Sequence, residues 1–131
     1  MSIETSNEPI IDAEEILEGI RAWVGIETPS HLGQEVNKLV DLVESQMEAL
    51  GAAIERTPGQ DDFGDILIAR TQWDHPPNTA GILVLSHLDT VHPLGTGQTT
   101  LQWRRDEDHV QGPGIYDMKA GAYIAYYAYQ H

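Results

Sequence analysis

The chain has 131 residues, enough for one compact domain with a buried core. Its formal net charge is −14, which disfavours nucleic acid or anionic lipid as a partner. The absence of cysteine excludes disulfides and thiolate metal sites, so His, Asp and Glu remain as metal ligands. The first ten residues do not have the pattern of a secretory signal, and no apolar run approaches the roughly 18 residues that span a bilayer. We therefore expect a soluble, cytoplasmic protein.

Two helices are predicted in the first half of the chain. Residues 1–11 have the composition of an acidic, flexible tail, and one domain is expected over residues 12–131. Asp12 followed by Glu15 has the form of a helix N-cap with its capping-box partner. Apolar residues then recur at helical spacing, at Ile16, Leu17, Ile20, Trp23 and Val24. A second helical stripe consists of Val36, Leu39, Val40, Val43, Met47 and Leu50. Gly51 follows that stripe, where a left-handed C-terminal cap is expected.

The rest of the chain favours strands and one more helix. Extended pieces are predicted over residues 52–57, 65–70, 81–87 and 109–111. The runs ILIA and ILVL are nearly continuously apolar, which is typical of strands that are buried on both faces by helices. Residues 118–129 predict a third, mostly apolar helix. We therefore expect an α/β domain with three layers, and the apolar helix at the end of the sequence suggests the front portion of a longer protein.

Two polar segments follow these elements and could carry chemistry. His87 and Asp89 lie two residues apart at the end of an expected strand, so both project to one side at the sheet edge where α/β proteins bind ligands. The glycine-rich loop GPGIYDMKAG brings Asp117 to the start of the third helix. A nucleotide cradle is not favoured, because Asp stands where a dinucleotide fingerprint has glycine and no GKS or GKT is present. Asp117 could also simply cap the helix.

These residue types suit a metal. A neutral imidazole and a carboxylate are ligands that Zn²⁺ accepts when no thiolate is available. A histidine that binds zinc normally has a second carboxylate that fixes its tautomer, and Asp89 is placed for that role.

The two segments SHLDTVHP and GPGIYDMKAG, in this order, resemble the cocatalytic zinc peptidase family that includes glutamate carboxypeptidase, acetylornithine deacetylase, succinyl-diaminopimelate desuccinylase and aminoacylase. The resemblance extends from about Asp12 to the end of the sequence and includes ETPS and the stripe that ends in EALGA. It implies the N-terminal part of a three-layer α/β/α catalytic domain. The implied activity is metal-dependent hydrolysis of a peptide or an N-acyl amino acid amide.

The resemblance also implies residue roles. His87 would bind one Zn²⁺, Asp89 would steady its imidazole as a catalytic residue, and Asp117 would bridge two Zn²⁺ ions, for which Co²⁺ or Mn²⁺ can substitute. The peptide bond from Asp117 to Met118 would be cis. Two metals about 3.5 to 4 Å apart share a water, lower its pKa and polarise an amide carbonyl.

The sequence also departs from the family. The family takes its general base from a pair of glutamates and further ligands, including a histidine, from positions after the second motif, and no Glu follows Glu107 here. The family's smaller lid and dimerisation domain has no counterpart either, although the complete protein could form a homodimer. We therefore expect this chain alone to have an incomplete, inactive site that binds zinc weakly.

Other interpretations stay open. The fold could serve as a non-catalytic metal-binding or interaction module, or His87 and Asp117 could only form hydrogen bonds within a structural domain. His92 could line the site entrance, although a solvated loop is favoured, and Lys119 could neutralise carboxylates near the metals or lie on the surface. The remaining histidines are expected at the surface: His31, His75, His109 and His131. The tyrosines of the third helix are expected in the core: Tyr123, Tyr126, Tyr127 and Tyr129.

Overall fold

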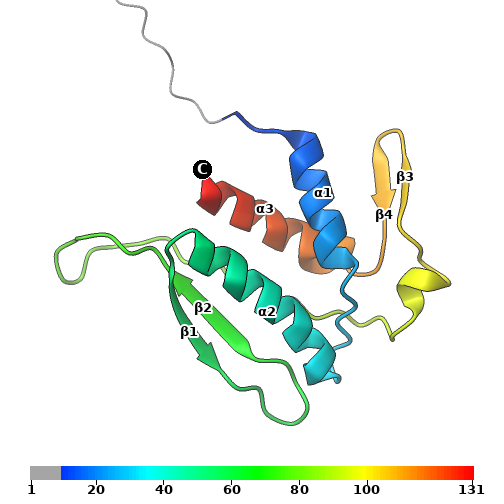
Figure 1. Ribbon diagram of the computed structural model, residues 1–131, viewed down its shortest axis with the longest axis horizontal. Helices are drawn as coiled ribbons and strands as arrows, with labels where there is room; N and C mark the ends of the chain where they lie inside the picture. Colours follow the sequence, from blue (N-terminus) through cyan, green and yellow to red (C-terminus); the bar gives the residue numbers. More distant parts are fainter. Residues whose placement is uncertain (1–9) are drawn as a thin grey trace, which may run out of the picture.

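The structure, a computed structural model, describes residues 10–131, so most of the predicted tail lies outside the described residues. It contains three α-helices and two β-hairpins (Figure 1). The helices are α1 (Ala13–Val24), α2 (Gly33–Ala49) and α3 (Ala120–Gln130). The strands are β1 (Ala53–Thr57), β2 (Ile66–Arg70), β3 (Arg104–Asp106) and β4 (His109–Gln111). A 3₁₀ turn (Thr96–Gln98) and a π-helical turn (Ile115–Lys119) complete the chain order.

The start of α1 is capped as the sequence predicts. Asp12 Oδ1 accepts hydrogen bonds from the N–H groups of Glu14 (2.9 Å) and Glu15 (3.2 Å). The reciprocal half of the capping box differs, because the Asp12 N–H donates to the hydroxyl of Tyr127 at 3.2 Å. That hydroxyl in turn donates to Glu15 Oε2 at 3.2 Å. The cap of α1 is thereby connected to α3.

The core lies between the helices. Trp23 of α1 is 1% exposed and meets the ring of Tyr123 edge-on, with 5.0 Å between the ring centroids. The indole N–H donates to Gln46 Oε1 at 3.0 Å, which connects α1 to α2. Leu39 of α2 is fully buried. The core positions predicted on α1 and α2 are therefore confirmed at Ile20, Trp23, Val24, Val36, Leu39 and Val40. Tyr123 and Tyr127 are also buried, as predicted, whereas Tyr126 and Tyr129 are only half-buried.

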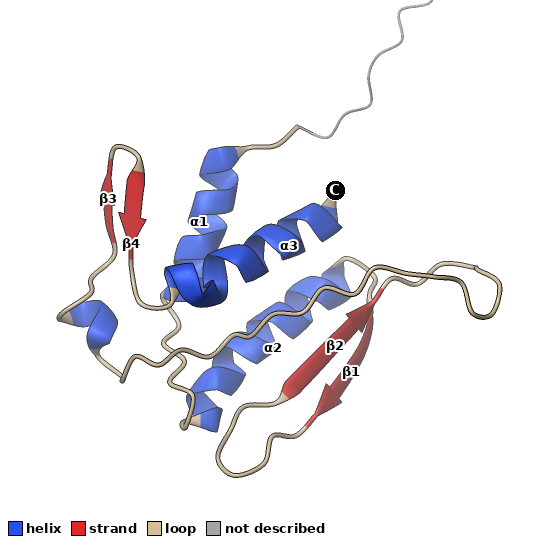
Figure 2. Cartoon of the chain, turned by 180° about the vertical axis from the view of Figure 1, so that it is seen from behind, coloured by secondary structure: helices blue, strands red, loops and turns tan. Residues whose placement is uncertain are grey.

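The β1–β2 hairpin packs beside α2, and the β3–β4 hairpin lies at the other end of the molecule (Figure 1). Arg56 of β1 joins the first hairpin to α2, since its guanidinium pairs with Asp41 at 2.7 Å, with Glu44 at 2.5 Å and with Asp65 at 2.8 Å. Figure 2 shows the same arrangement from behind. Gly51 follows α2 with a φ of +81°, the left-handed conformation that its position predicts.

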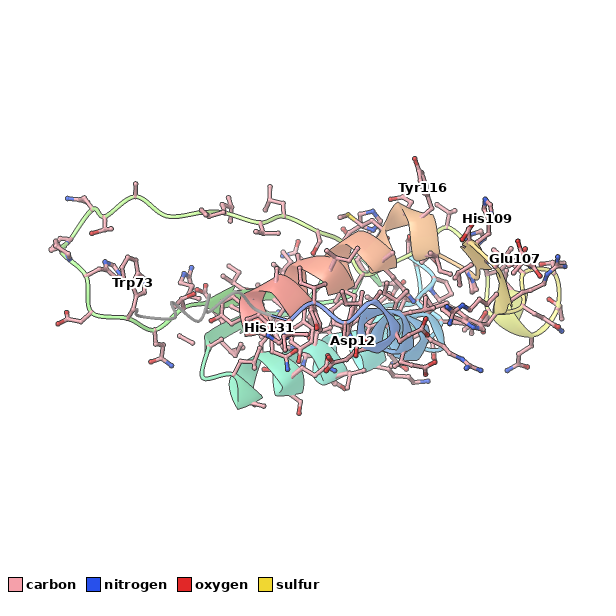
Figure 3. The ribbon with its side chains drawn as sticks, turned by 90° about the horizontal axis from the view of Figure 1, so that it is seen from above. Asp12, Trp73, Glu107, His109, Tyr116 and His131 are labelled. Carbon is pink, nitrogen blue, oxygen red and sulfur yellow. The ribbon has the colours of Figure 1, made fainter. Side chains whose placement is uncertain are left out.

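The prediction of a strand over residues 81–87 is wrong for this structure. The segment is extended but unpaired, and Ile82, Leu83, Val84 and Leu85 are between 63% and 95% exposed. Figure 3 shows the loop around Trp73 and the extended chain that follows it standing apart from the helices. A strand with apolar residues on both faces needs neighbouring strands and a covering layer on each side. Residues 10–131 provide no such neighbours.

The fold is therefore mixed α/β, as predicted, but the expected three-layer arrangement around a parallel sheet is not seen in residues 10–131. The described residues form two separate two-stranded antiparallel sheets. One face of the β1–β2 hairpin packs on α2, whereas Ile66 and Ile68 on its other face are 60% and 36% exposed. Within the described part of the chain, no helix is both long and apolar enough to cross a membrane.

Candidate functional site

The segment between α1 and α2 holds the loop that contains Asp89. The Thr90 N–H donates to the Thr28 carbonyl at 2.8 Å, and the buried Thr28 hydroxyl donates to the Leu88 carbonyl at 2.7 Å. Pro29 and Thr90 form an isolated parallel bridge. The ETPS sequence thus holds the chain at the end of the extended segment, although residues 82–85 themselves are exposed.

The glycine-rich loop meets the Asp89 loop at Gly114. Gly114 has a φ of +74°, and a Cβ at this position would lie 2.2 Å from Thr90 Cγ2, so only glycine allows this approach. The contact brings the following π-helical turn, and with it Asp117, to the end of the extended segment. The peptide bond between Asp117 and Met118 is cis, as the resemblance implies. The helix α3 begins at Ala120, two residues later than the sequence predicts.

His87 and Asp117 converge, as the two motifs predict. Nε2 of His87 lies 2.8 Å from Asp117 Oδ1. On the other side of the ring, Nδ1 lies 3.0 Å from the Asp89 carbonyl and 3.2 Å from Asp89 Oδ1. Asp89 therefore holds the imidazole, partly through its backbone and partly through its carboxylate. The side chains of His87 and Asp117 are 45% and 78% exposed, so the site is open to solvent.

These contacts restrict the protonation of His87. Both ring nitrogens face oxygen atoms of a carbonyl or of carboxylates. These oxygen atoms only accept hydrogen bonds, unless a carboxyl group is protonated. A neutral imidazole has one N–H and cannot satisfy both sides. The arrangement therefore favours a ring with two protons, or a ring in which a cation takes the place of the proton at Nε2.

The pKa of His87 reflects these contacts. Partial burial lowers the pKa, but the hydrogen bonds to Asp117 and to the Asp89 carbonyl raise it, and so do the charges of the two carboxylates. The pKa of His87 consequently lies above the ordinary histidine value of 6.5.

Ser30 is a site residue that the sequence interpretation did not single out. Its hydroxyl lies 2.5 Å from Asp89 Oδ2 and 3.0 Å from the Thr90 carbonyl. A chain of contacts therefore runs from Ser30 through Asp89 and His87 to Asp117. The ETPS sequence was part of the resemblance, but nothing local in it indicates that its serine reaches a residue 59 positions away.

A pocket of about 250 Å³ opens at this site. Its lining includes His87, Asp89 and Asp117, together with the half-buried His92. His92 thus lines the site rather than lying in a fully solvated loop. Tyr116, next to Asp117, is 99% exposed and points outward (Figure 3). The four other histidines are exposed, as predicted: His31, His75, His109 and His131.

Lys119 differs from both sequence interpretations. It is 1% exposed, and its ammonium group donates to the backbone carbonyls of Ile26 at 2.6 Å and Trp23 at 3.2 Å. The side chain therefore points into the protein and not toward the Asp117 carboxylate or the surface. Burial lowers the pKa of Lys119 to about 8, although the negative charge of Glu27 opposes this shift.

The donor set fits part of a zinc site. An imidazole nitrogen and a carboxylate oxygen face each other, and the second ring nitrogen is held by an acceptor, as in histidines that bind zinc. Within residues 10–131, no group of three or more His, Asp or Glu side chains is arranged to hold a metal ion. Two ligands are thus present for a metal that normally requires four.

A scan of the sequence against protein-family models finds no match, and a search of the curated proteins finds no significant match.

Proposed function

We propose that this chain provides part of the catalytic domain of a dinuclear zinc amidohydrolase, similar to glutamate carboxypeptidase. The observation that carries the proposal is the 2.8 Å contact between His87 Nε2 and Asp117 Oδ1, formed by residues from the two motifs that resemble the family. The proposed three-layer domain requires additional strands beside residues 81–87. The exposure of that apolar segment supports this part of the proposal.

In this proposal His87 would hold a zinc ion through Nε2, and the Asp117 carboxylate would be a ligand shared by the two zinc ions. Bound zinc would act as a Lewis acid on an amide carbonyl and would lower the pKa of a water molecule. The Asp89 carbonyl would accept a hydrogen bond from the Nδ1–H of His87, which fixes the tautomer and leaves the Nε2 lone pair for the metal. Ser30 holds the Asp89 carboxylate on its other side.

The proposed substrate is a peptide or an N-acyl amino acid. Such a molecule has an amide carbonyl and a carboxylate, and both are attracted to a pair of divalent cations. The net charge of −14 does not oppose this, because the local field near the metals dominates at the distance of a bound substrate.

A non-catalytic metal-binding module is the second candidate. It is favoured by the geometry of residues 10–131, in which His87 and Asp117 face each other but no group of three or more His, Asp or Glu side chains is arranged to hold a metal ion. The same His87 and Asp117 would then bind a metal without hydrolysis.

The test is a zinc-dependent amidase assay on the protein expressed from its complete reading frame, with N-acyl amino acids and dipeptides as substrates. The proposal predicts turnover that requires zinc and that is lost in His87→Ala and in Asp117→Asn. Two bound zinc ions without turnover would favour the binding module. Absence of zinc binding would contradict both candidates.

A further inference from the structure

The side chain of Lys119 connects the loop that carries Asp117 to the end of α1. It lies two residues beyond Asp117, and its ammonium donates to Ile26 and Trp23 carbonyls at 2.6 Å and 3.2 Å. These carbonyls belong to the last turn of α1 and the residues after it, where backbone acceptors lack helical partners and the helix dipole favours a positive charge. The bonds therefore connect the start of α3 to the end of α1.

The chain around the end of α1 also contacts the loop that carries Asp89. We call residues 23–30 the anchor segment. Its Thr28 carbonyl accepts from Thr90, and its Ser30 hydroxyl contacts the Asp89 carboxylate. The Glu27 carboxylate accepts the N–H groups of Gly95 and Gly97, both at 2.9 Å. The loops that carry Asp89 and Asp117 are thus attached to one segment.

We propose that Lys119 is a positioning residue that sets the location of Asp117 relative to His87 by tying the Asp117 loop to the anchor segment. Where it concerns metal affinity, the inference rests on the proposed zinc site. The positioning itself also acts in the metal-free protein, where His87 and Asp117 are already in contact.

Packing alone does not explain a lysine at this position. Burying an ammonium is unfavourable, and an apolar side chain of similar volume often gives a protein that is as stable or more stable. The two hydrogen bonds to the anchor segment are what an apolar residue cannot provide. Because the nitrogen is directed to α1, Lys119 does not contact His87 or Asp117, and it acts on their contact through the position of its loop.

The first test compares Lys119→Met with Lys38→Met by zinc titration. Both variants lose one lysine charge. Lys38 is a 60% exposed residue of α2 that, among the described residues, pairs with Glu35 alone. Groups that orient metal ligands typically contribute about 10- to 100-fold to metal affinity, so Lys119→Met should lose at least about tenfold. Lys38→Met should bind zinc like the unchanged chain. Lys119→Met that is folded, by its near-ultraviolet circular dichroism, and binds zinc with unchanged affinity would overturn the proposal.

The second test needs no metal. The pKa of His87 is measured by NMR in the metal-free chain and in Lys119→Met. If Asp117 moves away, the pKa of His87 falls, because its hydrogen-bond acceptor is lost. Losing a nearby positive charge would by itself raise that pKa, so the two effects have opposite signs. An unchanged or raised pKa in the folded variant would contradict positioning by Lys119.

A chemical rescue separates positioning from general stability. The chain has no cysteine, so Lys119→Cys can be alkylated selectively with 2-bromoethylamine in the unfolded state and then refolded. The product carries an ammonium on a side chain of nearly the original length. The proposal predicts that alkylation restores zinc affinity and the pKa of His87.

The outcomes distinguish this inference from the proposed function. If the unchanged chain binds no zinc, the proposed function fails and the His87 titration alone decides the inference. If the unchanged chain binds zinc and Lys119→Met binds it equally well, only the inference fails. If Lys119→Met and unmodified Lys119→Cys both fail to fold, Lys119 is required for folding and the positioning role is overturned.

Discussion

His87 Nε2 and Asp117 Oδ1 lie 2.8 Å apart, although the residues are 30 positions apart in the chain. Nδ1 of the same ring faces the Asp89 carbonyl at 3.0 Å. One imidazole thus lies between acceptors from two loops, and a proton or a metal ion can take the position at Nε2. Competition between the two gives the site a defined dependence on pH.

Zinc binding should strengthen as pH rises through the raised pKa of His87. Below that pKa zinc must displace a proton, so its affinity should rise about tenfold per pH unit and then level off. The stability of the metal-free protein should change in the opposite direction and decrease as pH rises. Since the folded pKa of His87 lies above the unfolded value of 6.5, its stabilising effect is complete below 6.5 and is lost as pH rises through the folded pKa.

Calorimetric zinc titrations between about pH 6 and pH 8 measure the first effect, and urea unfolding without metal measures the second. His109→Ala, which removes an exposed histidine of β4, should change neither profile. Zinc affinity that is independent of pH over this range would contradict the assignment of Nε2.

Thr28→Val should destabilise the protein by about 1 to 2 kcal/mol, because the Leu88 carbonyl loses its buried donor while the side-chain shape is kept. Thr99→Val is the matched control, since the Thr99 hydroxyl also donates to a carbonyl, that of Gly95, but is exposed. The control should cost less than about 0.5 kcal/mol. Equal losses in urea unfolding would show that the Thr28 bond does not hold the Asp89 loop.

Arg56→Met should cost about 1 to 3 kcal/mol, because three carboxylates near one another lose their common partner. The same contacts hold the pKa of Arg56 above its ordinary value. Arg70→Met removes an arginine from the adjacent strand whose pair with Glu55 is more than half exposed, and it should cost less than about 1 kcal/mol. Comparable effects of the two substitutions on unfolding would contradict a structural role for the Arg56 cluster.

Leu83→Lys should reduce self-association of the chain. Residues 82–85 are extended, unpaired and apolar on both faces, which makes them a template for pairing with another chain, and a lysine disfavours such pairing. Val91→Lys changes a single 90% exposed residue outside the segment and should have little effect. Light scattering over a concentration series compares the two variants, and equal scattering would count against the segment as the cause.

The sequence predicts the helices well because their signals are local. The apolar stripe of α2, the Asp12 cap and the left-handed Gly51 each depend on residues within one or two turns. The convergence of His87 and Asp117 is not local, and the sequence predicts it mainly through the resemblance of the two motifs to the zinc peptidase family.

The errors come from long-range contacts. The ILVL pattern predicts a strand that is covered on both faces. It does not indicate whether residues 10–131 supply the neighbouring strands and helices, and in this structure Leu83 is exposed. Lys119 reads as a surface residue because nothing near it in sequence shows that the end of α1 offers two carbonyls. Ser30 is not predicted as a site residue for the same reason, because its partner Asp89 is 59 positions away.

The most direct test of the account is zinc titration of the chain by calorimetry, beside His87→Ala, Asp117→Asn and the exposed control Asp108→Asn. With two ligands the chain should bind zinc in about the micromolar range, weaker than a complete site. His87→Ala and Asp117→Asn should each lose at least about tenfold in affinity, and Asp108→Asn should lose none. Nanomolar binding by the unchanged chain, or binding that survives both substitutions, would contradict the assignment of these residues as the zinc ligands.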